Sequence, residues 1–168
     1  MHVLGSHLHA VCMPSPQLTK GRHSSLYSAY AVTLVTRQRQ RLFSDPAMSV
    51  IVRAWLRQSD HEGSSQTHAW VVMPDHLHWL FALRNGELSD CVRRFKSRSA
   101  RAINQARQTC DAVWQTGFHD HRLRDDEDLL IRARYIIANP LRAGLVEDVR
   151  EYPHWGCRWI SRDEGLAG

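Results

Sequence analysis

The sequence predicts an α+β fold of the ferredoxin-like type, an antiparallel sheet with packed helices. Two observations lead to it. The periodic segments follow the order strand, helix, strand, strand, helix, strand, which is typical of the split βαβ arrangement, and a further helix comes after them. The chain of 168 residues also has the size of a single compact domain.

The first strand and the first helix are indicated by their residue types. Residues 30–36 are rich in Val, Thr and Tyr, as strands are. Asp45 followed by Pro46 is the pattern of an N-cap and a first helical residue. The helix that begins there is expected to face the core with residues at three-and-four spacing, which are Ala47, Val50, Ile51, Ala54 and Gln58.

A β-hairpin is predicted by two apolar runs, residues 70–73 and 77–83, with a Pro-Asp turn between them. Because side chains alternate between the faces of a strand, His76 and His78 share one face and large apolar residues occupy the other. The apolar face belongs to the core. Two neighbouring imidazoles suit Mn, Zn, Fe, Ni or Cu, whereas Mg prefers oxygen. The alternative is a pair of histidines that cap the turn or lie half-exposed.

A second helix is predicted over residues 88–107 and a fourth strand over residues 113–123. The segment between Cys91 and Cys110 has no acidic residue, and its six basic residues are Arg93, Arg94, Lys96, Arg98, Arg101 and Arg107. A solvated helix face usually mixes charges of both signs, so this excess favours contact with phosphates over plain solvation. Arg122 and Arg124 extend the same positive field.

The last predicted helix carries a tyrosine and an asparagine four residues apart. Residues 125–138 open with four acidic residues, which favour a helix N-terminus, and continue with apolar residues. Tyr135 and Asn139 then point the same way, and the Asn139 amide could join the two histidines around a metal beside the phenol. Pro140 loosens this argument, because it disfavours helical backbone at the residue before it. The alternative is a buried tyrosine and a helix-capping asparagine.

Three segments resemble the REP-associated tyrosine transposases, the domesticated branch of the bacterial single-tyrosine HUH transposases. They are residues 70–80 (WVVMPDHLHWL), 113–124 (VWQTGFHDHRLR) and 135–146 (YIIANPLRAGLV). The resemblance spans about residues 20–160, with the segments in the family's order. It implies that His76, His78 and Asn139 bind a divalent metal ion, Mg or Mn, and that Tyr135 is the nucleophile.

The resemblance further implies the reaction. The protein is expected to be a metal-dependent single-stranded DNA endonuclease and strand transferase that acts on REP-type hairpins through a 5′-phosphotyrosine. The basic residues named above are the expected DNA contacts. Two alternatives stay open: a non-catalytic protein that binds nucleic-acid hairpins and regulates, and a metal-dependent hydrolase in which water attacks and Tyr135 is structural.

Composition agrees with a nucleic-acid partner. The net charge of +5 and the pI near 9.4 suit a polyanion, although they also fit an anionic membrane surface. No apolar run reaches the roughly 20 residues of a membrane span, so we expect no membrane insertion. Four scattered cysteines without a Cys-x-x-Cys pattern indicate reduced thiols rather than a zinc ribbon or disulfides. The expected location is the cytoplasm, in association with the nucleoid.

The domain is expected to cover residues 21–160, between a flexible tail of residues 1–20 and a short tail of residues 161–168. Residues 1–12 are interpreted as the product of a mis-assigned start, because relatives of the family begin much as this chain does from Met13. Aromatic residues near the end, Tyr152, Trp155 and Trp159, are expected to dock on the core. We expect a monomer, with a dimer as the alternative.

Overall fold

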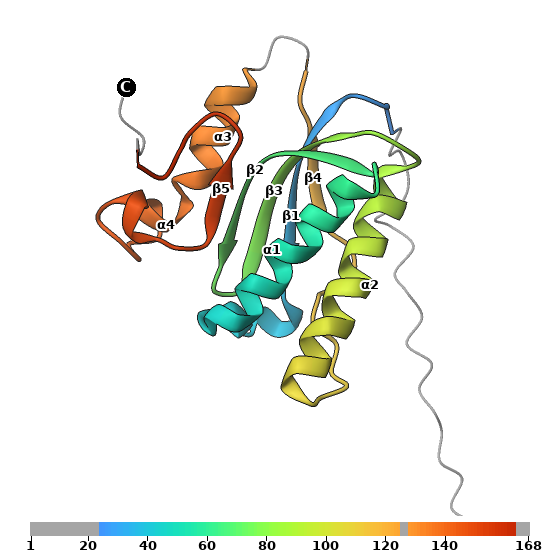
Figure 1. Ribbon diagram of the computed structural model, residues 1–168, viewed down its shortest axis with the longest axis vertical. Helices are drawn as coiled ribbons and strands as arrows, with labels where there is room; N and C mark the ends of the chain where they lie inside the picture. Colours follow the sequence, from blue (N-terminus) through green and yellow to red (C-terminus); the bar gives the residue numbers. More distant parts are fainter. Residues whose placement is uncertain (1–23, 125–127, 164–168) are drawn as a thin grey trace, which may run out of the picture.

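A computed structural model describes residues 24–124 and 128–163. Its centre is a five-stranded antiparallel sheet in the order β4-β1-β3-β2-β5 (Figure 1). The strands are β1 (Ala29–Val35), β2 (Ser65–Met73), β3 (His76–Leu83), β4 (His119–Arg122) and β5 (Trp155–Cys157). The first four have the ferredoxin-like order, so the predicted fold class is confirmed.

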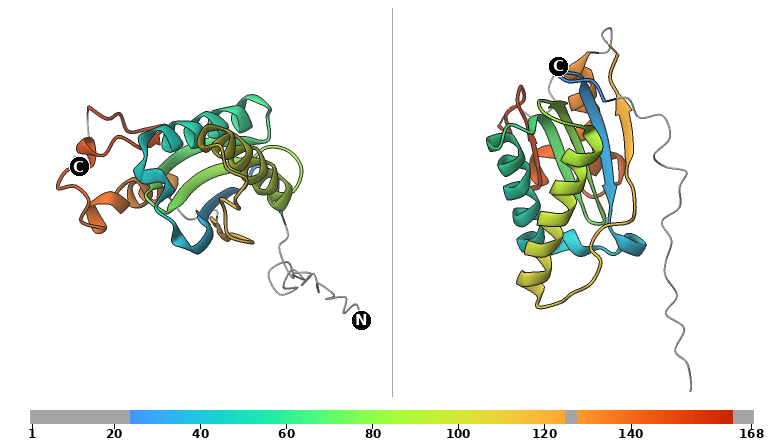
Figure 2. Two further views of the ribbon diagram at one scale, coloured as in Figure 1. Left: turned by 90° about the horizontal axis from the view of Figure 1, so that it is seen from below. Right: turned by 90° about the vertical axis from the view of Figure 1, so that its right-hand side faces the viewer.

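The helices cover both faces of the sheet, with α1 and α2 together on one face and α3 on the other (Figure 2). The α-helices are α1 (Pro46–His61), α2 (Leu88–Arg107), α3 (Leu129–Ile137) and α4 (Asn139–Arg142). Short 3-10 helices are η2 (Arg37–Arg39), η3 (Leu42–Ser44) and η4 (Val149–Glu151). We call the two sides of the sheet the α1 face and the α3 face.

Each face has its own core, as the alternation in β3 predicts. Side chains of α1 and α2 pack on the α1 face against Leu77, Trp79, Phe81 and Leu83. On the α3 face, Leu80 packs with Ala133 and Ile136 of α3. His76 and His78 are on this second face, because they alternate with the large apolar residues. The last helix therefore covers the sheet face that carries the two histidines.

The fourth strand is shorter than predicted. Of residues 113–123, only His119–Arg122 pair regularly with β1, and Trp114 forms an isolated bridge with Thr36. Between them the chain turns at Gly117, whose φ is +76°. The Lys96 ammonium holds this turn by donating to the carbonyls of Gln115 and Gly117 at 2.6 and 2.7 Å.

The predicted inner stripe of the first helix is wrong except at Ile51, which packs against the core, and the predicted start of the helix is confirmed. The Asp45 carboxylate accepts from the backbone N–H of Ala47 at 2.9 Å, as an N-cap does. Val50, however, is 50% exposed, whereas Val52 is fully buried. The helix instead turns another stripe toward the sheet, and its buried residues are Met48, Ser49, Val52, Leu56 and Ser59.

The C-terminal segment adds β5, which pattern analysis did not predict. Trp155 is 1% exposed and its indole N–H donates to Val149, while the Tyr152 hydroxyl donates to the Val72 carbonyl at 2.7 Å. These two aromatics dock on the core as expected, but Trp159 is 41% exposed, so the expectation is wrong there. The predicted N-terminal tail lies outside the described residues, as do residues 164–168 of the C-terminal one.

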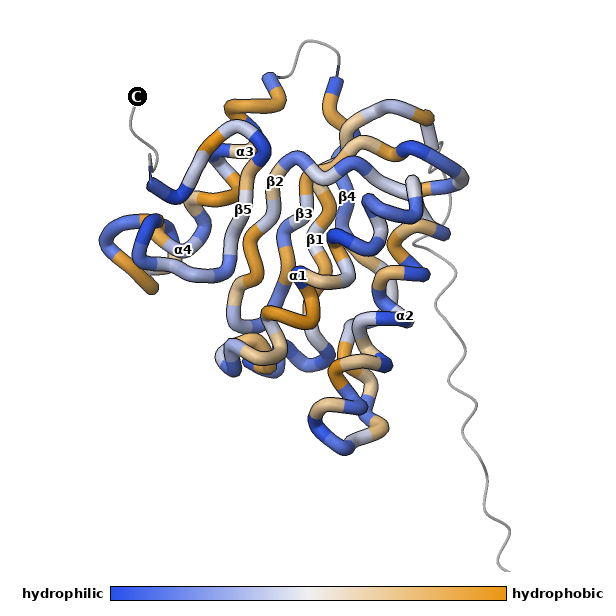
Figure 3. The backbone as a smooth tube through the Cα atoms, viewed as in Figure 1, coloured by the Kyte–Doolittle hydropathy of each residue, from blue (hydrophilic) through white to orange (hydrophobic). Residues whose placement is uncertain are grey.

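Hydropathy follows this layered arrangement. Apolar segments run along the central strands, and polar and apolar residues alternate along the helices (Figure 3). Within the described ranges, no helix is both long and apolar enough to span a bilayer.

Candidate metal and tyrosine site

The two histidines at the start of β3 point their outer nitrogens at each other. The Nε2 atoms of His76 and His78 are 3.1 Å apart, and the two rings are perpendicular with centroids 4.7 Å apart. Two nitrogens that bind one cation at about 2.1 Å, at right angles, are about 3 Å apart. The pair therefore has the spacing of two ligands of a single metal ion.

The inner nitrogens of both rings are held by side chains. His76 Nδ1 donates to the Asp75 carboxylate at 2.5 Å, and His78 Nδ1 bonds the Thr33 hydroxyl, on the paired strand β1, at 2.9 Å. A partner at Nδ1 sets the tautomer and leaves the Nε2 lone pair free for a metal ion. When the Thr33 hydroxyl accepts from His78 Nδ1, as Asp75 accepts from His76 Nδ1, both Nε2 lone pairs are directed into the same space.

The protonation states of His78 and Asp75 favour binding of a cation at the histidine pair. Burial lowers the pKa of His78 to about 4, and the positive charges of His76 and Arg142 act in the same direction. The ring is therefore neutral at physiological pH, which is the form that binds metals. Burial opposes ionisation of Asp75, but the bonds and charges of His76 and Arg39 lower its pKa. The carboxylate stays ionised and continues to orient His76.

Tyr135 lies on α3 with its side chain in solvent. It is 56% exposed, so the alternative of a buried tyrosine is wrong. The Arg142 guanidinium lies 3.8 Å from the centroid of the phenol ring and also donates to the Tyr135 carbonyl at 2.8 Å. The charge of the same arginine acts on His78. Arg142 thus connects the tyrosine to the histidine pair.

Asn139 is the first residue of α4. The break predicted from Pro140 occurs one residue earlier, at Ala138, where φ is −80° and ψ is 0°. The Asn139 amide N–H donates to the Ile136 carbonyl at 2.7 Å, and no described residue donates to its Oδ1. The carboxamide oxygen is therefore available as a ligand.

A third ligand of this type is needed at the histidine pair. Among the described residues, no three His, Cys, Asp or Glu side chains form a group that could hold a metal ion. Two imidazoles with an amide oxygen and solvent are a donor set that Mn accepts readily and Mg less usually. The residues present thus fit a divalent cation.

The predicted DNA contacts do not gather around this site. α2 packs on the α1 face, across the sheet from the histidines. On it, Arg93 pairs with Asp90 and Arg98 pairs with Glu62, at 3.0 and 2.6 Å. The Lys96 ammonium is used by the turn at Gly117. Three of these six side chains thus have partners within the fold.

The other basic side chains lie in solvent. Arg94, Arg101 and Arg107 are exposed on α2, and no described carboxylate pairs with them. Arg122 ends the edge strand β4, and Arg124 follows it, both exposed. The positive field is therefore spread along α2 and the β4 edge of the sheet.

Sequence reasoning missed three residues of the site. Asp75 and Thr33 hold the histidines, and Arg142 holds the tyrosine. His119 pairs with Thr33 across β4 and β1, as His78 does from the other side, so both histidines lie on the α3 face. A sequence signal existed for Arg142, which comes seven residues after Tyr135, a spacing of about two helical turns.

Comparison with known proteins decides the family. The profile described as "Transposase IS200 like" matches residues 24–139, from the start of the described domain to the candidate ligand Asn139. The chain belongs to the IS200-like transposase family. This confirms the expected class of enzyme, a tyrosine transposase.

The relatives of this IS200-like transposase carry the expected group name. The REP-associated tyrosine transposase of Escherichia coli is 28% identical over 126 residues, covering 74% of the chain and 72% of the relative. A Haemophilus influenzae protein assigned to the same group is 29% identical over 136 residues, covering 74% of the chain and 77% of that protein.

A solved structure has the same fold. It is the structure of a REP-associated tyrosine transposase bound to a REP hairpin, with a TM-score of 0.66 and 24% identity, covering 80% of this chain and 79% of that one. The resemblance in the three sequence segments is thus confirmed for family and fold.

Proposed function

We propose that this IS200-like transposase cleaves single-stranded DNA beside a hairpin and rejoins strands, with Tyr135 as the nucleophile. The observation that carries the proposal is the convergence of two Nε2 lone pairs, 3.1 Å apart, on the sheet face that the tyrosine helix covers. A purely structural histidine pair has no need of two separate Nδ1 partners that direct both outer nitrogens to one point.

His76, His78 and Asn139 would hold a divalent cation, Mn or Mg. A bound cation of this kind withdraws charge from a phosphate and stabilises the oxygens that become negative. The chain's own residues keep the ligands in place. Asp75 and Thr33 orient the two rings, and the bond from the Asn139 amide nitrogen to the Ile136 carbonyl fixes the carboxamide.

Tyr135 would attack the phosphorus atom of a DNA strand. The bond from the phenol oxygen to phosphorus forms as the bond to the 3′ oxygen breaks, the phenol gives up its proton, and the leaving oxygen takes one up. A 5′-phosphotyrosine and a free 3′-hydroxyl result. Because the phosphodiester energy is kept, a second 3′-hydroxyl can reverse the step and join strands. Arg142, stacked on the ring, orients the phenol for attack.

The substrate would be a hairpin of the REP type. A relative of the same fold is described as bound to a REP hairpin, and the chain carries a net charge of +5. Phosphate contacts would come from exposed basic residues, which are Arg93, Arg94, Arg98, Arg101, Arg122 and Arg124. The partly buried Lys96 would contribute as well. We further propose one catalytic domain over residues 21–160 that acts as a monomer on DNA of the nucleoid.

One assay tests this function. Single-stranded hairpin DNA is incubated with protein and Mn or Mg, and denaturing gels are examined for a covalent protein–DNA adduct. The unaltered protein should form the adduct, and Tyr135→Phe should bind the same DNA without forming it. Cleavage that persists in Tyr135→Phe would indicate attack by water instead. Binding without cleavage by the unaltered protein would indicate a non-catalytic hairpin-binding protein.

A further inference from the structure

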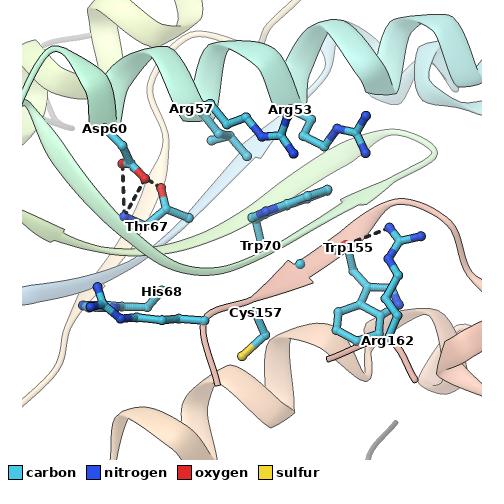
Figure 4. A pocket seen from close by; sticks show the side chains of 12 residues that line it. Arg53, Arg57, Asp60, Thr67, His68, Trp70, Trp155, Cys157 and Arg162 are labelled. Carbon is cyan, nitrogen blue, oxygen red and sulfur yellow. Dashed lines mark hydrogen bonds between the residues drawn. The ribbon is translucent and has the colours of Figure 1, made fainter. Parts of the chain in front are cut away.

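A second candidate site lies at the β5 edge of the sheet, away from the histidine pair. It is a pocket of about 360 Å³ between α1, β2 and the C-terminal segment (Figure 4). Pockets of a few hundred Å³ are the usual size for small ligands. Nothing in the reaction described above uses it.

The wall of the pocket contains a buried histidine with an unused nitrogen. His68 is 8% exposed, and its Nδ1 has no hydrogen-bond partner among the described residues. A buried polar atom normally has a partner, so this nitrogen makes His68, which lines the pocket, a candidate contact for a ligand. Burial, followed by the charge of Arg158, lowers the pKa of His68, so the ring is neutral and can donate or accept.

An irregularity in β2 sets the position of this histidine. The pairing of β2 with β3 shifts register between Thr67 and Ala69, so His68 is the extra residue of a β-bulge. Bulges often redirect a side chain beside a functional site. The Trp159 ring stacks on the imidazole with centroids 5.2 Å apart, and the Arg158 N–H donates to the His68 carbonyl at 2.8 Å. The C-terminal segment thus fixes the ring at the pocket.

Positive charge in the pocket is not neutralised. Arg53 and Arg57, one helical turn apart, extend from α1 toward the Trp70 indole (Figure 4), and Arg158 lies in the lining as well. No carboxylate in the described part of the chain pairs with any of these three guanidinium groups.

The one carboxylate in the lining is already used. Asp60 accepts from the hydroxyl of Ser65 at 2.6 Å and from the hydroxyl and N–H of Thr67 at 2.9 and 3.1 Å. Arg162 also lines the pocket, and burial, followed by the charge of Arg53, lowers its pKa. An anionic ligand would neutralise part of this positive charge.

The floor of the pocket is the indole ring of Trp70, which packs closely on a glycine. The half-exposed Trp70 indole lies on Gly156 of β5, where a Cβ atom would be only 2.7 Å from the indole nitrogen. Any other residue at Gly156 would push the ring away. The arginines Arg53 and Arg57 lie between the indole and α1 (Figure 4), and planar bases stack on such rings regardless of sequence.

We infer that this pocket binds a nucleotide unit of a single DNA strand. Its phosphate would lie against Arg53, Arg57 and Arg158, its base would stack on Trp70, and His68 Nδ1 would bond a polar atom of the ligand. A free nucleotide has the same chemistry, so the test must separate the two sources. The inference rests on the proposed function in one respect: a DNA substrate supplies the strand.

The test measures binding of a fluorescent eight-residue thymidine oligonucleotide by anisotropy, in EDTA, with Tyr135→Phe protein so that no cleavage intervenes. The double variant Arg53→Gln/Arg57→Gln should weaken binding about tenfold or more. The matched control is Arg150→Gln, which loses one exposed arginine outside the pocket and should change affinity less than twofold. Unchanged thermal melting shows that the variants fold. Equal affinity of the double variant and the parent would overturn the inference.

Competition identifies the source of the ligand. Thymidine monophosphate should displace the oligonucleotide only at concentrations about 100-fold above those of unlabelled oligonucleotide. Equal potency of the mononucleotide would contradict a strand site, and displacement by pyrophosphate at the same potency would contradict a role for the base. As a second variant, Gly156→Ala should weaken oligonucleotide binding with all arginines intact.

These results are independent of the adduct assay. Loss of the pocket's binding with normal adduct formation would leave the proposed function in place. Normal oligonucleotide binding without any adduct would do the reverse.

Discussion

The histidines in two regions of the sheet differ in what their ring nitrogens contact. On the α3 face, at the start of β3, His76 and His78 have partners at Nδ1 and direct their Nε2 atoms to one point. At the β5 edge, His68 has an Nδ1 without a partner among the described residues and lines a pocket that contains several arginines. The first arrangement suits a cation and the second an anion. The same residue type therefore serves opposite purposes, according to the atoms that surround it.

The largest effect is expected on formation of the covalent adduct, when the proposed nucleophile is removed. Tyr135→Phe removes the phenol oxygen that is proposed to form the phosphotyrosine, so adduct formation should fall at least ~1000-fold while DNA binding is kept. Its matched control is Tyr27→Phe, which alters another exposed tyrosine. Adduct yields on denaturing gels measure both. An adduct formed equally well by Tyr135→Phe would refute the assignment of the nucleophile.

The second largest effect is expected on metal affinity, when one proposed histidine ligand is removed. His78→Ala removes one of two nitrogen ligands and should weaken Mn binding roughly 100-fold in calorimetry, because a divalent ion depends strongly on each protein ligand. His119→Ala, on the same face but two strands away, is the control and should alter Mn affinity less than twofold. Similar losses in both variants would place the metal elsewhere.

A smaller loss of metal affinity is expected from a change to the carboxylate that orients one histidine. Asp75→Asn keeps the shape of the side chain but weakens its hold on His76 Nδ1, so Mn affinity should fall about tenfold. Calorimetry with this variant and with Arg39→Gln, which contacts only the other Asp75 oxygen, separates orientation of the ring from general charge. No loss in Asp75→Asn would mean that the carboxylate does not orient the ligand.

The smallest effect on metal affinity is expected from a substitution in β5, away from the histidine pair. Gly156→Ala pushes against the Trp70 indole and should cost about 1–3 kcal/mol of unfolding free energy, as overpacking does. Urea unfolding measures that loss. Mn affinity should stay within twofold of the parent's, because the histidine pair lies away from β5. A large drop in Mn affinity would show that the two regions are coupled.

The features that could be predicted from sequence depend on local periodicity. Alternation along β3 places His76 and His78 opposite a row of large apolar residues without any knowledge of the fold, and the Asp45 cap is likewise a local feature. The approach of Tyr135 to that face followed only from the family resemblance. The structure supports it through Arg142, which contacts the phenol ring and acts on His78.

The features that were missed depend on long-range contacts. β5 has three residues, too few for a periodic signal, and exists because β2 offers it an edge. His68 escaped notice because a bulge, which no alternation pattern reveals, redirects it. The inner stripe of α1 was misplaced because two apolar sets share that helix, and only packing on the sheet selects Val52 over Val50.

The central claim is that one cation is shared by the histidine pair and the asparagine beside the tyrosine helix. Anomalous diffraction from crystals grown with Mn tests it most directly. The expected result is one strong peak within about 2.3 Å of His76 Nε2, His78 Nε2 and Asn139 Oδ1, on the side of Tyr135. A peak elsewhere, or one that touches a single histidine and faces away from α3, would contradict it.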